Sequence, residues 1–410
     1  MDFTRSEAEI EASQLAARIL ASSTTATSTA PRVHTSTAPR PDTSTAPRPD
    51  TSTATASRAT AAAVTVADVN TDFDTGLWKD LAQAGLLSLA LPADIGGDEL
   101  GVQAAAAVLT EAGRSAARVP ALATLGLGVL PVMRCADPAI KRQLLAGVPT
   151  GDTVLTAAIR ERSDPMPAAP RTVAILTGGD PPATLTGLKT GVPYAAAANW
   201  ILVPASTSDG GAPVRTVVAV IEPTADGLCC QRTRSSSGLP EYTLRLADTP
   251  VLHLLDGCDA DELYRIAVAS ACAVADGVLA AALDLTTEHI RSREQFGRPL
   301  ATFQAVAQQI ADVYATARTL HLATVSACWQ LDKRHAGRDT DVAAYWLASC
   351  GPRAMRKCHH LHGGLGMDIT YPLARYSALL TDLVALVGGA DDRLERLSRR
   401  ELTAAEAADA

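Results

Sequence analysis

The chain of 410 residues carries 36 basic against 44 acidic residues, so its formal net charge is −8. This balance argues against a nucleic-acid-binding protein, because a protein that binds the phosphate backbone needs a basic face to displace counterions. Hydrophobic residues make up 47% of the chain but aromatic residues only 4%, which favours several domains of closely packed helices over a sandwich of sheets.

The N-terminal part is predicted to be helical and to contain a disordered insert. The sequence starts with charged residues and no apolar signal segment, which indicates a cytoplasmic protein. After the first helical stripe, the unit TSTAPRPD recurs with small changes between Thr27 and Ala54. Its prolines forbid a helix, and its hydroxyl residues have little to bury. We expect disorder at about residues 22–62, inside an N-terminal helical domain of residues 1–150.

The secondary-structure pattern of the sequence then changes twice. Helical patterns continue through Val102–Ala117 and give way to short β-rich runs that Gly, Pro, Asp and Ser residues separate. Farther along the chain the helical period returns. These patterns predict a mainly α protein in which a middle β-domain, residues 151–256, precedes a C-terminal four-helix bundle, residues 257–410.

The longest apolar stretch, Ile266–Leu285, is nearly long enough to cross a bilayer. Asp276 and Asp284 interrupt it, and alanine is its commonest residue. We therefore expect a buried helix and no membrane span.

The cysteines and histidines suggest neither a disulfide framework nor a metal site. The eight cysteines form no CxxC pair and no regular spacing, which predicts reduced thiols in the core. Cys358, His359, His360 and His362 are of the types that bind zinc. Ligands crowded into one helical turn cannot converge on a tetrahedral ion, so we predict no metal.

Two segments have residues suited to a ligand. Residues 291–300 read RSREQFGRPL, and arginine presents a planar fork of donors that fits a phosphate or pyrophosphate. The alternative is a solvated helix end without a ligand, at which Phe296 forms a hydrophobic staple. Residues 362–372 read HGGLGMDITYP and turn through glycines that let a ligand approach the backbone.

These blocks resemble the flavin-dependent acyl-CoA dehydrogenases. The run LWKDLAQAGLLSLALPADIGG at residues 77–97, the pattern RxQFGRPLxxFQAV from Arg293 and the HGGLGMDITYP block occur in the family's order. The resemblance covers the chain apart from the repeat. It implies that flavin adenine dinucleotide (FAD) lies between the β-domain and the C-terminal helices. It also implies that a glutamate removes the α-proton of an acyl-CoA thioester while the flavin takes the β-hydride.

The resemblance further implies a cofactor site. Arg293 matches the arginine that crosses a dimer interface to the pyrophosphate of the neighbouring subunit's FAD. Gln295 and Phe296 match the residues that accompany this arginine in the family. His360 and Gly364 fall where the family places a glutamine and a glycine at the adenosine end of FAD. We therefore expect FAD contacts from Arg293, Gln295, Phe296, His360, Gly363 and Gly364.

The sequence departs from the family at the catalytic base. The usual position of the glutamate falls on Val387, and the position that some members use, on the long helix before Arg293, falls on Ala267. Neither side chain can take a proton. Asp382 and Glu262, each five residues earlier, would be turned by about 140° to another helix face. We expect them to be solvated or capping acids, and we predict no catalytic residue in this chain.

The β-domain departs as well. The signature that should follow the first strand reads TAAIR at Thr156–Arg160, and the stretch that stacks on the flavin ring reads GVPY at Gly191–Tyr194. Both losses concern the redox half of the site, whereas Arg293 is retained.

A chain that lacks the base and the flavin-ring contacts but keeps Arg293 resembles the β, non-catalytic partner of actinobacterial heterotetrameric acyl-CoA dehydrogenases. These enzymes desaturate CoA esters of steroid side chains. The resemblance implies a homologous catalytic subunit as partner, FAD shared at the subunit interface, an acyl-CoA substrate bound in the complex, and an electron-transfer acceptor. The alternatives are an active homo-oligomeric enzyme with a relocated base and a flavin-free scaffold on the same fold.

Overall fold

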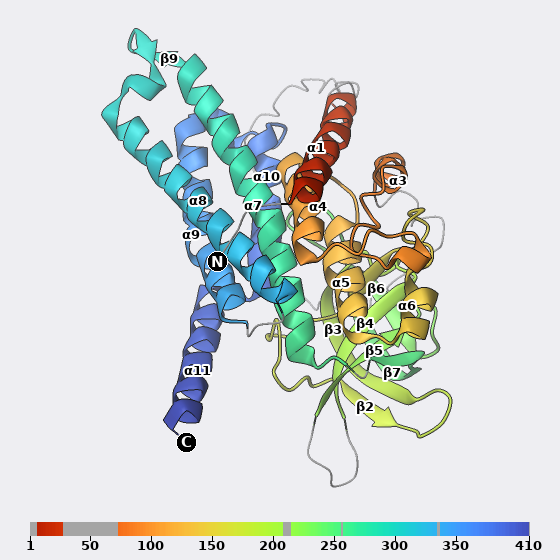
Figure 1. Ribbon diagram of the computed structural model, residues 1–410. Helices are drawn as coiled ribbons and strands as arrows, with labels where there is room; N and C mark the ends of the chain where they lie inside the picture. Colours follow the sequence, from red (N-terminus) through yellow and green to blue (C-terminus); the bar gives the residue numbers. More distant parts are fainter. Residues whose placement is uncertain (1–5, 28–72, 208–214, 256, 334–336, 410) are drawn as a thin grey trace, which may run out of the picture.

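The computed structural model describes residues 6–27, 73–207, 215–255, 257–333 and 337–409. Long C-terminal helices stand to one side of a β-sheet, and the N-terminal helices lie between them and above the sheet (Figure 1). The predicted order of helical, β and helical parts is confirmed, as is the mainly α fold class.

The N-terminal elements are α1 (Glu7–Thr27), α3 (Thr75–Gln83), η1 (Ala93–Ile95), α4 (Val102–Ser115), the π-helix η2 (Leu122–Val129), α5 (Leu130–Cys135) and α6 (Pro138–Leu145). The strands of the sheet are β1 (Leu155–Ala157), β2 (Val173–Leu176), β3 (Ala183–Pro193), β4 (Trp200–Thr207), β5 (Thr216–Ile221), β6 (Leu228–Arg234), β7 (Pro240–Pro250) and β8 (His253–Leu255). The C-terminal elements are α7 (Ala260–Ser292), β9 (Glu294–Gln295), β10 (Arg298–Pro299), η3 (Leu300–Thr302), α8 (Gln304–Asp332), α9 (Arg338–His362), η4 (Gly363–Met367), α10 (Pro372–Val387) and α11 (Gly389–Asp409).

The helix α1 is longer than the sequence suggested. It continues to Thr27, past the predicted start of the insert near residue 22. The first proline of the repeat comes only at Pro31, so nothing in the backbone chemistry ends the helix earlier. Most of the predicted insert, including nearly all of the repeat, lies outside the described residues.

The sheet brings distant strands together. Its strand order is β6-β7-β3-β2-β4-β5-β8, and β1 pairs in parallel with β4. The long strand β7 alternates buried Tyr242, Leu244 and Leu246 with outward-facing residues, as expected where one face covers a core. The central strand β4 is almost entirely buried.

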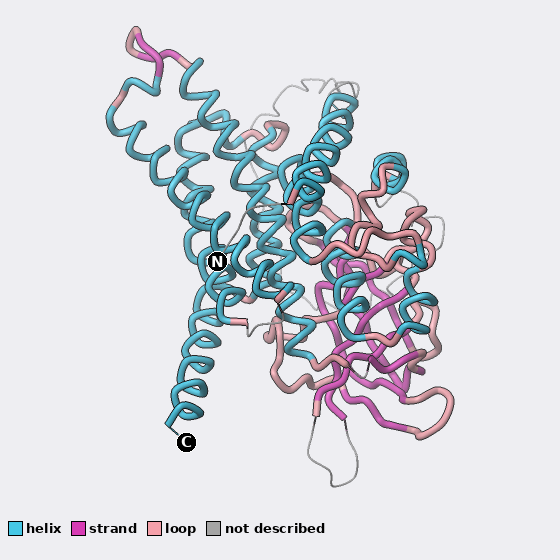
Figure 2. Tube along the Cα trace, in the orientation of Figure 1, coloured by secondary structure: helices cyan, strands magenta, loops and turns pink. Residues whose placement is uncertain are grey.

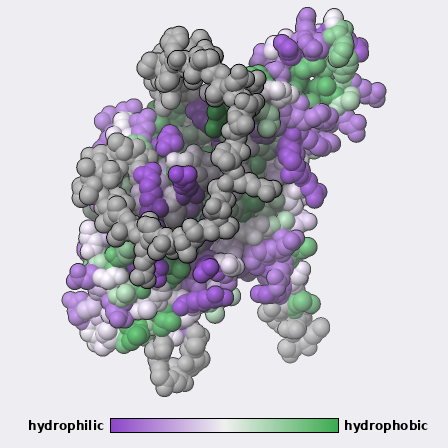
Figure 3. All heavy atoms as spheres, turned by 180° about the vertical axis from the view of Figure 1, so that it is seen from behind, coloured by the Kyte–Doolittle hydropathy of each residue, from purple (hydrophilic) through white to green (hydrophobic). Residues whose placement is uncertain are grey.

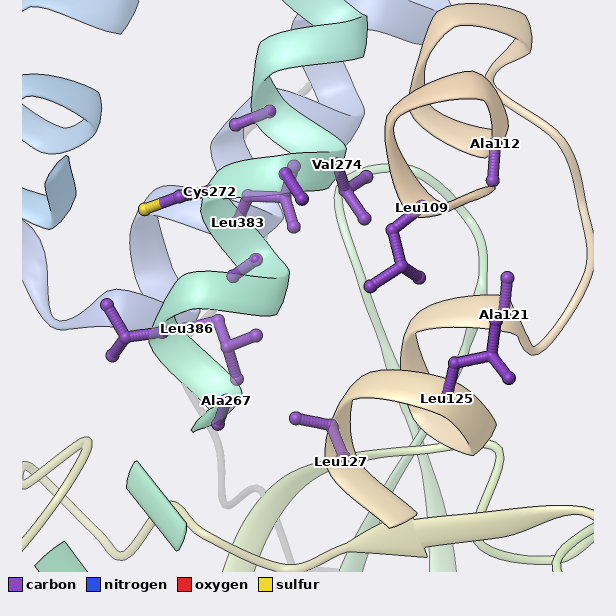
Figure 4. Packing of buried hydrophobic residues seen from close by; sticks show 14 of the residues in the cluster. Leu109, Ala112, Ala121, Leu125, Leu127, Ala267, Cys272, Val274, Leu383 and Leu386 are labelled. Carbon is purple, nitrogen blue, oxygen red and sulfur yellow. The ribbon is translucent and has the colours of Figure 1, made fainter. Parts of the chain in front are cut away.

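Small residues let α7 lie close to α4. A Cβ on Gly277 would come within 1.8 Å of the carbonyl oxygen of Thr110, and a Cβ on Gly113 within 2.0 Å of the carbonyl oxygen of Val274. Larger residues at either position would force the helices apart. Figure 4 shows side chains from α4, η2, α7 and α10 meeting in one apolar cluster. The prediction of a buried apolar helix is confirmed, since 89% of the most apolar window of α7 is buried.

The C-terminal helices extend away from the sheet. The helices α7 to α10 pack together, α11 continues along α9, and the small β9–β10 hairpin lies at the end of the bundle far from the large sheet (Figure 2). Among the described residues, α7 and the segment Pro372–Leu402 are long and apolar enough to span a membrane. The second segment is divided at Gly388, which has a φ of 98°. Its apolar part, the 16-residue α10, is about 24 Å long and shorter than a hydrocarbon core of about 30 Å.

The prediction that the cysteines are reduced thiols is wrong for two of them. Cys135 at the end of α5 and Cys258 just before α7 form a disulfide, with their Cα atoms 4.9 Å apart. These cysteines are 123 positions apart in the chain, so the spacing gave no sign of the pairing. Within the described ranges the other six cysteines form no disulfide, and Cys272, Cys328 and Cys358 among them are buried.

Candidate cofactor-binding site

The first predicted cofactor-binding segment is the hairpin at the end of α7. The backbone N–H of Arg293 donates to the carbonyl oxygen of His289 at 2.8 Å, and the N–H of Leu300 donates to the carbonyl oxygen of Arg293 at 2.9 Å. These bonds close the hairpin and leave the side chains of Arg293, Gln295 and Phe296 exposed. Phe296 is 91% exposed, and Figure 3 shows apolar atoms on this projecting end of the molecule, bordered by hydrophilic ones. An exposed guanidinium and ring are available to another molecule.

The second predicted segment is the glycine turn after α9. His360 pairs through Nδ1 with Oε1 of Gln309 on α8, at 2.9 Å. Gly363 has a φ of 59°, and a Cβ added at Gly363 or Gly364 would meet no atom within 4 Å. Open space above the glycine backbone lets a ligand come close. The six predicted residues are thus exposed on two segments at the same end of the bundle.

Two imidazoles join these segments, and the sequence did not reveal this contact. The ring of His289, one turn before the hairpin, stacks on the ring of His362 with centroids 4.5 Å apart and planes 20° apart. His362 also packs against Tyr371, at 5.2 Å. The one available signal was the position of His289 four residues before Arg293, which places it on the last turn of a helix.

The histidines of the second segment do not converge on an ion. His359 pairs through Nδ1 with the carbonyl oxygen of Gly366 at 2.7 Å, and His362 with that of Cys358 at 2.8 Å. Within the described ranges, no group of three or more His, Cys, Asp or Glu side chains is placed to hold a metal ion.

A cavity of about 100 Å³ lies between the sheet and the helices, where the family resemblance implies the flavin ring and the acyl chain. Its walls are mostly apolar residues of α4, η2 and α10, together with Tyr194 at the end of β3. Arg160, Glu241 and Asp382 are its charged residues. None of these three was predicted to bind FAD.

The two acids considered as substitute bases are engaged elsewhere. Asp382 lines the cavity rather than facing away from it, but its two oxygens accept the backbone N–H groups of Ser236 and Ser237, both at 2.8 Å. Glu262 is paired with Arg134 at 2.6 Å and also with Arg265. Asp382 therefore anchors the turn between β6 and β7 to α10, and Glu262 belongs to a structural ion-pair network.

The space beside the GVPY stretch is filled by this chain. A Cβ on Gly191 would come within 2.6 Å of the Arg160 guanidinium, so the glycine, with a φ of 65°, lets that side chain lie against the backbone. Burial raises the pKa of Glu241, and the positive charge of Arg160 and a hydrogen bond from Thr233 oppose this effect. The hydroxyl of Thr156 donates to the carbonyl oxygen of Pro193 at 2.7 Å.

The interior does not fit a flavin. Sites for ligands of this size measure roughly 300–1,000 Å³. The cavity of about 100 Å³ is too small for an isoalloxazine together with an acyl chain, and a half-buried arginine and two acids are part of its lining. The exposed hairpin and glycine turn do fit part of a dinucleotide, because a guanidinium and an open glycine backbone suit a diphosphate and its sugar.

Two family models and a curated relative match this chain. Residues 50–152 match the model of the acyl-CoA dehydrogenase N-terminal domain, and residues 263–401 match that of the C-terminal domain. The chain is 41% identical over 349 residues to acyl-CoA dehydrogenase FadE28 of Mycobacterium tuberculosis, a match that covers 84% of this chain and 97% of that protein.

Two solved structures resemble the chain over nearly its full length. A variant of the Tcur3481–Tcur3483 steroid ACAD (acyl-CoA dehydrogenase) has a TM-score of 0.80 at 30% identity, covering 98% of both chains. The ChsE4–ChsE5 complex from Mycobacterium tuberculosis has a TM-score of 0.81 at 29% identity, covering 98% of this chain and 99% of that one. Both names pair two different chains.

Proposed function

The chain belongs to the acyl-CoA dehydrogenase family, and we propose that it is the non-catalytic subunit of an enzyme built from two homologous chains. The family uses FAD, which accepts the hydride from the β-carbon of the acyl group when it is bound. In this proposal the partner subunit holds the flavin ring and the base. This chain contributes exposed contacts to the diphosphate and adenosine end of the partner's FAD.

The closed interior is the observation that carries the proposal. Val387 and Ala267, the two positions where the resemblance implies the family's base, are fully buried and cannot exchange a proton. Arg160 lies beside Gly191 where the resemblance implies the flavin ring. Asp382 is held by two backbone donors, which argues against its use as a relocated base.

The exposed end of the bundle supports the shared cofactor. No element in the described part of the chain covers Arg293, Gln295 or Phe296, and the glycine turn at Gly363 and Gly364 is open. The names of two structural relatives describe complexes of two chains, one of them a steroid enzyme. We therefore assign CoA esters of steroid side chains as the substrate class of the complex and an electron-transfer protein as its acceptor.

The proposal also covers the organisation of the chain. We place it in the cytoplasm and divide it into residues 1–150, 151–256 and 257–410. The strands of the large sheet fall between α6 and α7, which supports this division.

The test is to purify the chain alone and together with its homologous partner, and to measure FAD affinity in the complex. We expect little flavin on the chain alone. Arg293→Ala should weaken FAD binding to the complex by about ten- to a hundredfold, because it removes a charge-assisted contact worth roughly 1.5–3 kcal/mol. Arg293→Lys should recover only part of the affinity, since an ammonium lacks the planar fork.

Arg298→Ala is the matched control, because its guanidinium lies over the Phe303 ring of the same chain, 4.1 Å from the centroid. This change should leave FAD affinity nearly unchanged. Unchanged affinity in Arg293→Ala would contradict the shared-cofactor role and favour the flavin-free scaffold.

A further inference from the structure

The stacked imidazoles connect the two segments assigned to the partner's FAD. His289 lies on the last turn of α7, and its carbonyl oxygen accepts the N–H of Arg293 at 2.8 Å. His362 is the last residue of α9 and directly precedes Gly363. The stacked rings, with centroids 4.5 Å apart, are therefore a direct packing contact between the arginine hairpin and the glycine turn.

Hydrogen bonding fixes the tautomer of His362. A carbonyl oxygen only accepts, so the 2.8 Å contact with Cys358 means that Nδ1 carries the hydrogen and donates. The side chain is 4% exposed, and its Nε2 is buried without a partner. In the neutral ring this atom is a bare acceptor. A second proton would place a donor there with no acceptor, and a positive charge against the ring of His289.

The surroundings of the pair oppose charge on either ring. Burial lowers the pKa of His289 from its usual 6.5, and the neighbouring His362 and Arg293 lower it further. Burial also lowers the pKa of His362, against the Cys358 carbonyl, and His359 adds to the decrease. Tyr371 is a further titratable group that packs against His362, and burial raises its pKa, so it stays neutral.

We propose that His289 and His362 are positioning residues that hold the arginine hairpin and the glycine turn in register for the partner's FAD only while both rings are neutral. This inference rests on the proposed function. Its consequence is a flavin affinity that depends on pH through residues that do not touch the flavin.

The direction follows from proton binding. In a separated arrangement the two histidines titrate near their usual pKa of 6.5, whereas in the stacked arrangement they take up protons only at lower pH. The separated arrangement therefore gains protons first as the pH falls below 6.5, and the stacked arrangement loses stability relative to it. FAD affinity should be constant above neutral pH and should decrease below it.

The experiment measures the dissociation constant of FAD from the assembled complex at pH 7.5 and at pH 5.5. Because both histidines take up protons more readily in the separated arrangement, the unmodified complex should bind FAD at least about threefold more weakly at pH 5.5 than at pH 7.5. His289→Phe keeps a ring in the stack but cannot be protonated. It should bind FAD normally at pH 7.5 and lose less than about a third as much affinity at pH 5.5.

The matched control is His253→Gln, which changes a half-buried histidine of β8 that pairs with Gln143. It should keep the full pH dependence, and comparing variants of one complex cancels titrations that belong to the partner subunit. Unmodified pH dependence in His289→Phe would overturn the inference. If Arg293→Ala weakens FAD binding and His289→Phe keeps the normal pH profile, only the inference fails; if Arg293→Ala has no effect, the proposed function fails.

A second measurement does not need the partner. Imidazole resonances of the full chain, assigned with His289→Phe and His362→Phe, should titrate below 6.5 for both residues. Ordinary titration of both rings would overturn the inference even if no complex could be assembled.

Discussion

Lys189 and Glu161 form an ion pair inside the β-domain. Their nearest nitrogen and oxygen are 2.7 Å apart, and their side chains are 0% and 3% exposed. Glu161 also accepts hydrogen bonds from Thr172 and from the backbone N–H of Arg171. Burial lowers the pKa of Lys189 to about 8, with Glu161 opposing the change. The two charges are tolerated together because each is the other's main partner.

Removing one charge of this pair should be far more damaging than removing both. Lys189→Met leaves a buried carboxylate unpaired and should lower the free energy of unfolding by about 3–5 kcal/mol. Adding Glu161→Gln removes that charge and keeps an acceptor for Thr172, so the double variant should recover much of the loss. Urea unfolding measures both. Lys357→Met, which breaks the exposed pair with Asp312, is the control and should cost less than about 1 kcal/mol.

Equal losses in the single and double variants would show that side-chain volume, rather than the unpaired charge, determines the stability at this position.

At the scale of elements, one carboxylate connects α10 to the sheet. Asp382 accepts from the N–H groups of Ser236 and Ser237 in the turn between β6 and β7. The same turn continues to Leu239 and Pro240, which line the interior cavity. The position of α10 against the sheet, and so the closure of the cavity, depends on this contact.

Asp382→Asn should destabilise the chain without a specific effect on catalysis. An amide offers one acceptor oxygen where the turn presents two donors, so the loss in unfolding free energy should be about 1.5–3 kcal/mol. Asp284→Asn, at an exposed ion pair with Arg114, is the control and should have little effect. Stability comes from denaturant unfolding and turnover from the assembled complex. A loss of turnover of about a hundredfold or more with unchanged stability would instead identify Asp382 as a base.

At the scale of the whole molecule, the chain is closed in its interior and open at one end. The cavity of about 100 Å³ is too small for a flavin and substrate, whereas the hairpin beyond α7 and the glycine turn after α9 are exposed among the residues that the structure describes. This shape supports the proposal that the chain acts as part of a complex. It is suited to supply contacts across an interface.

The purified chain alone should not desaturate any acyl-CoA when it is assayed with an artificial electron acceptor, because it has no base within reach of an α-proton. Val387→Glu alone should not restore turnover, since Arg160 and Gly191 still occupy the space beside the cavity. The complex with the homologous subunit is the positive control. Robust turnover by the single chain would support an active enzyme with a relocated base.

The sequence by itself determined the order of helical and β parts, the buried character of α7 and the absence of a base at Val387 and Ala267. Each of these depends on local information: a periodicity of apolar residues, a run of small residues, or the identity of one residue at a position that the family fixes. The family assignment was equally accessible, because its blocks are continuous in the chain.

Only the tertiary structure decided how the sites are assembled. Asp382 anchors Ser236 from 146 positions away, and the Cys135–Cys258 disulfide joins cysteines 123 positions apart. The stack of His289 on His362 likewise joins the ends of two separate helices. Such contacts are set by how helices and strands pack against one another, and no spacing along the chain encodes them.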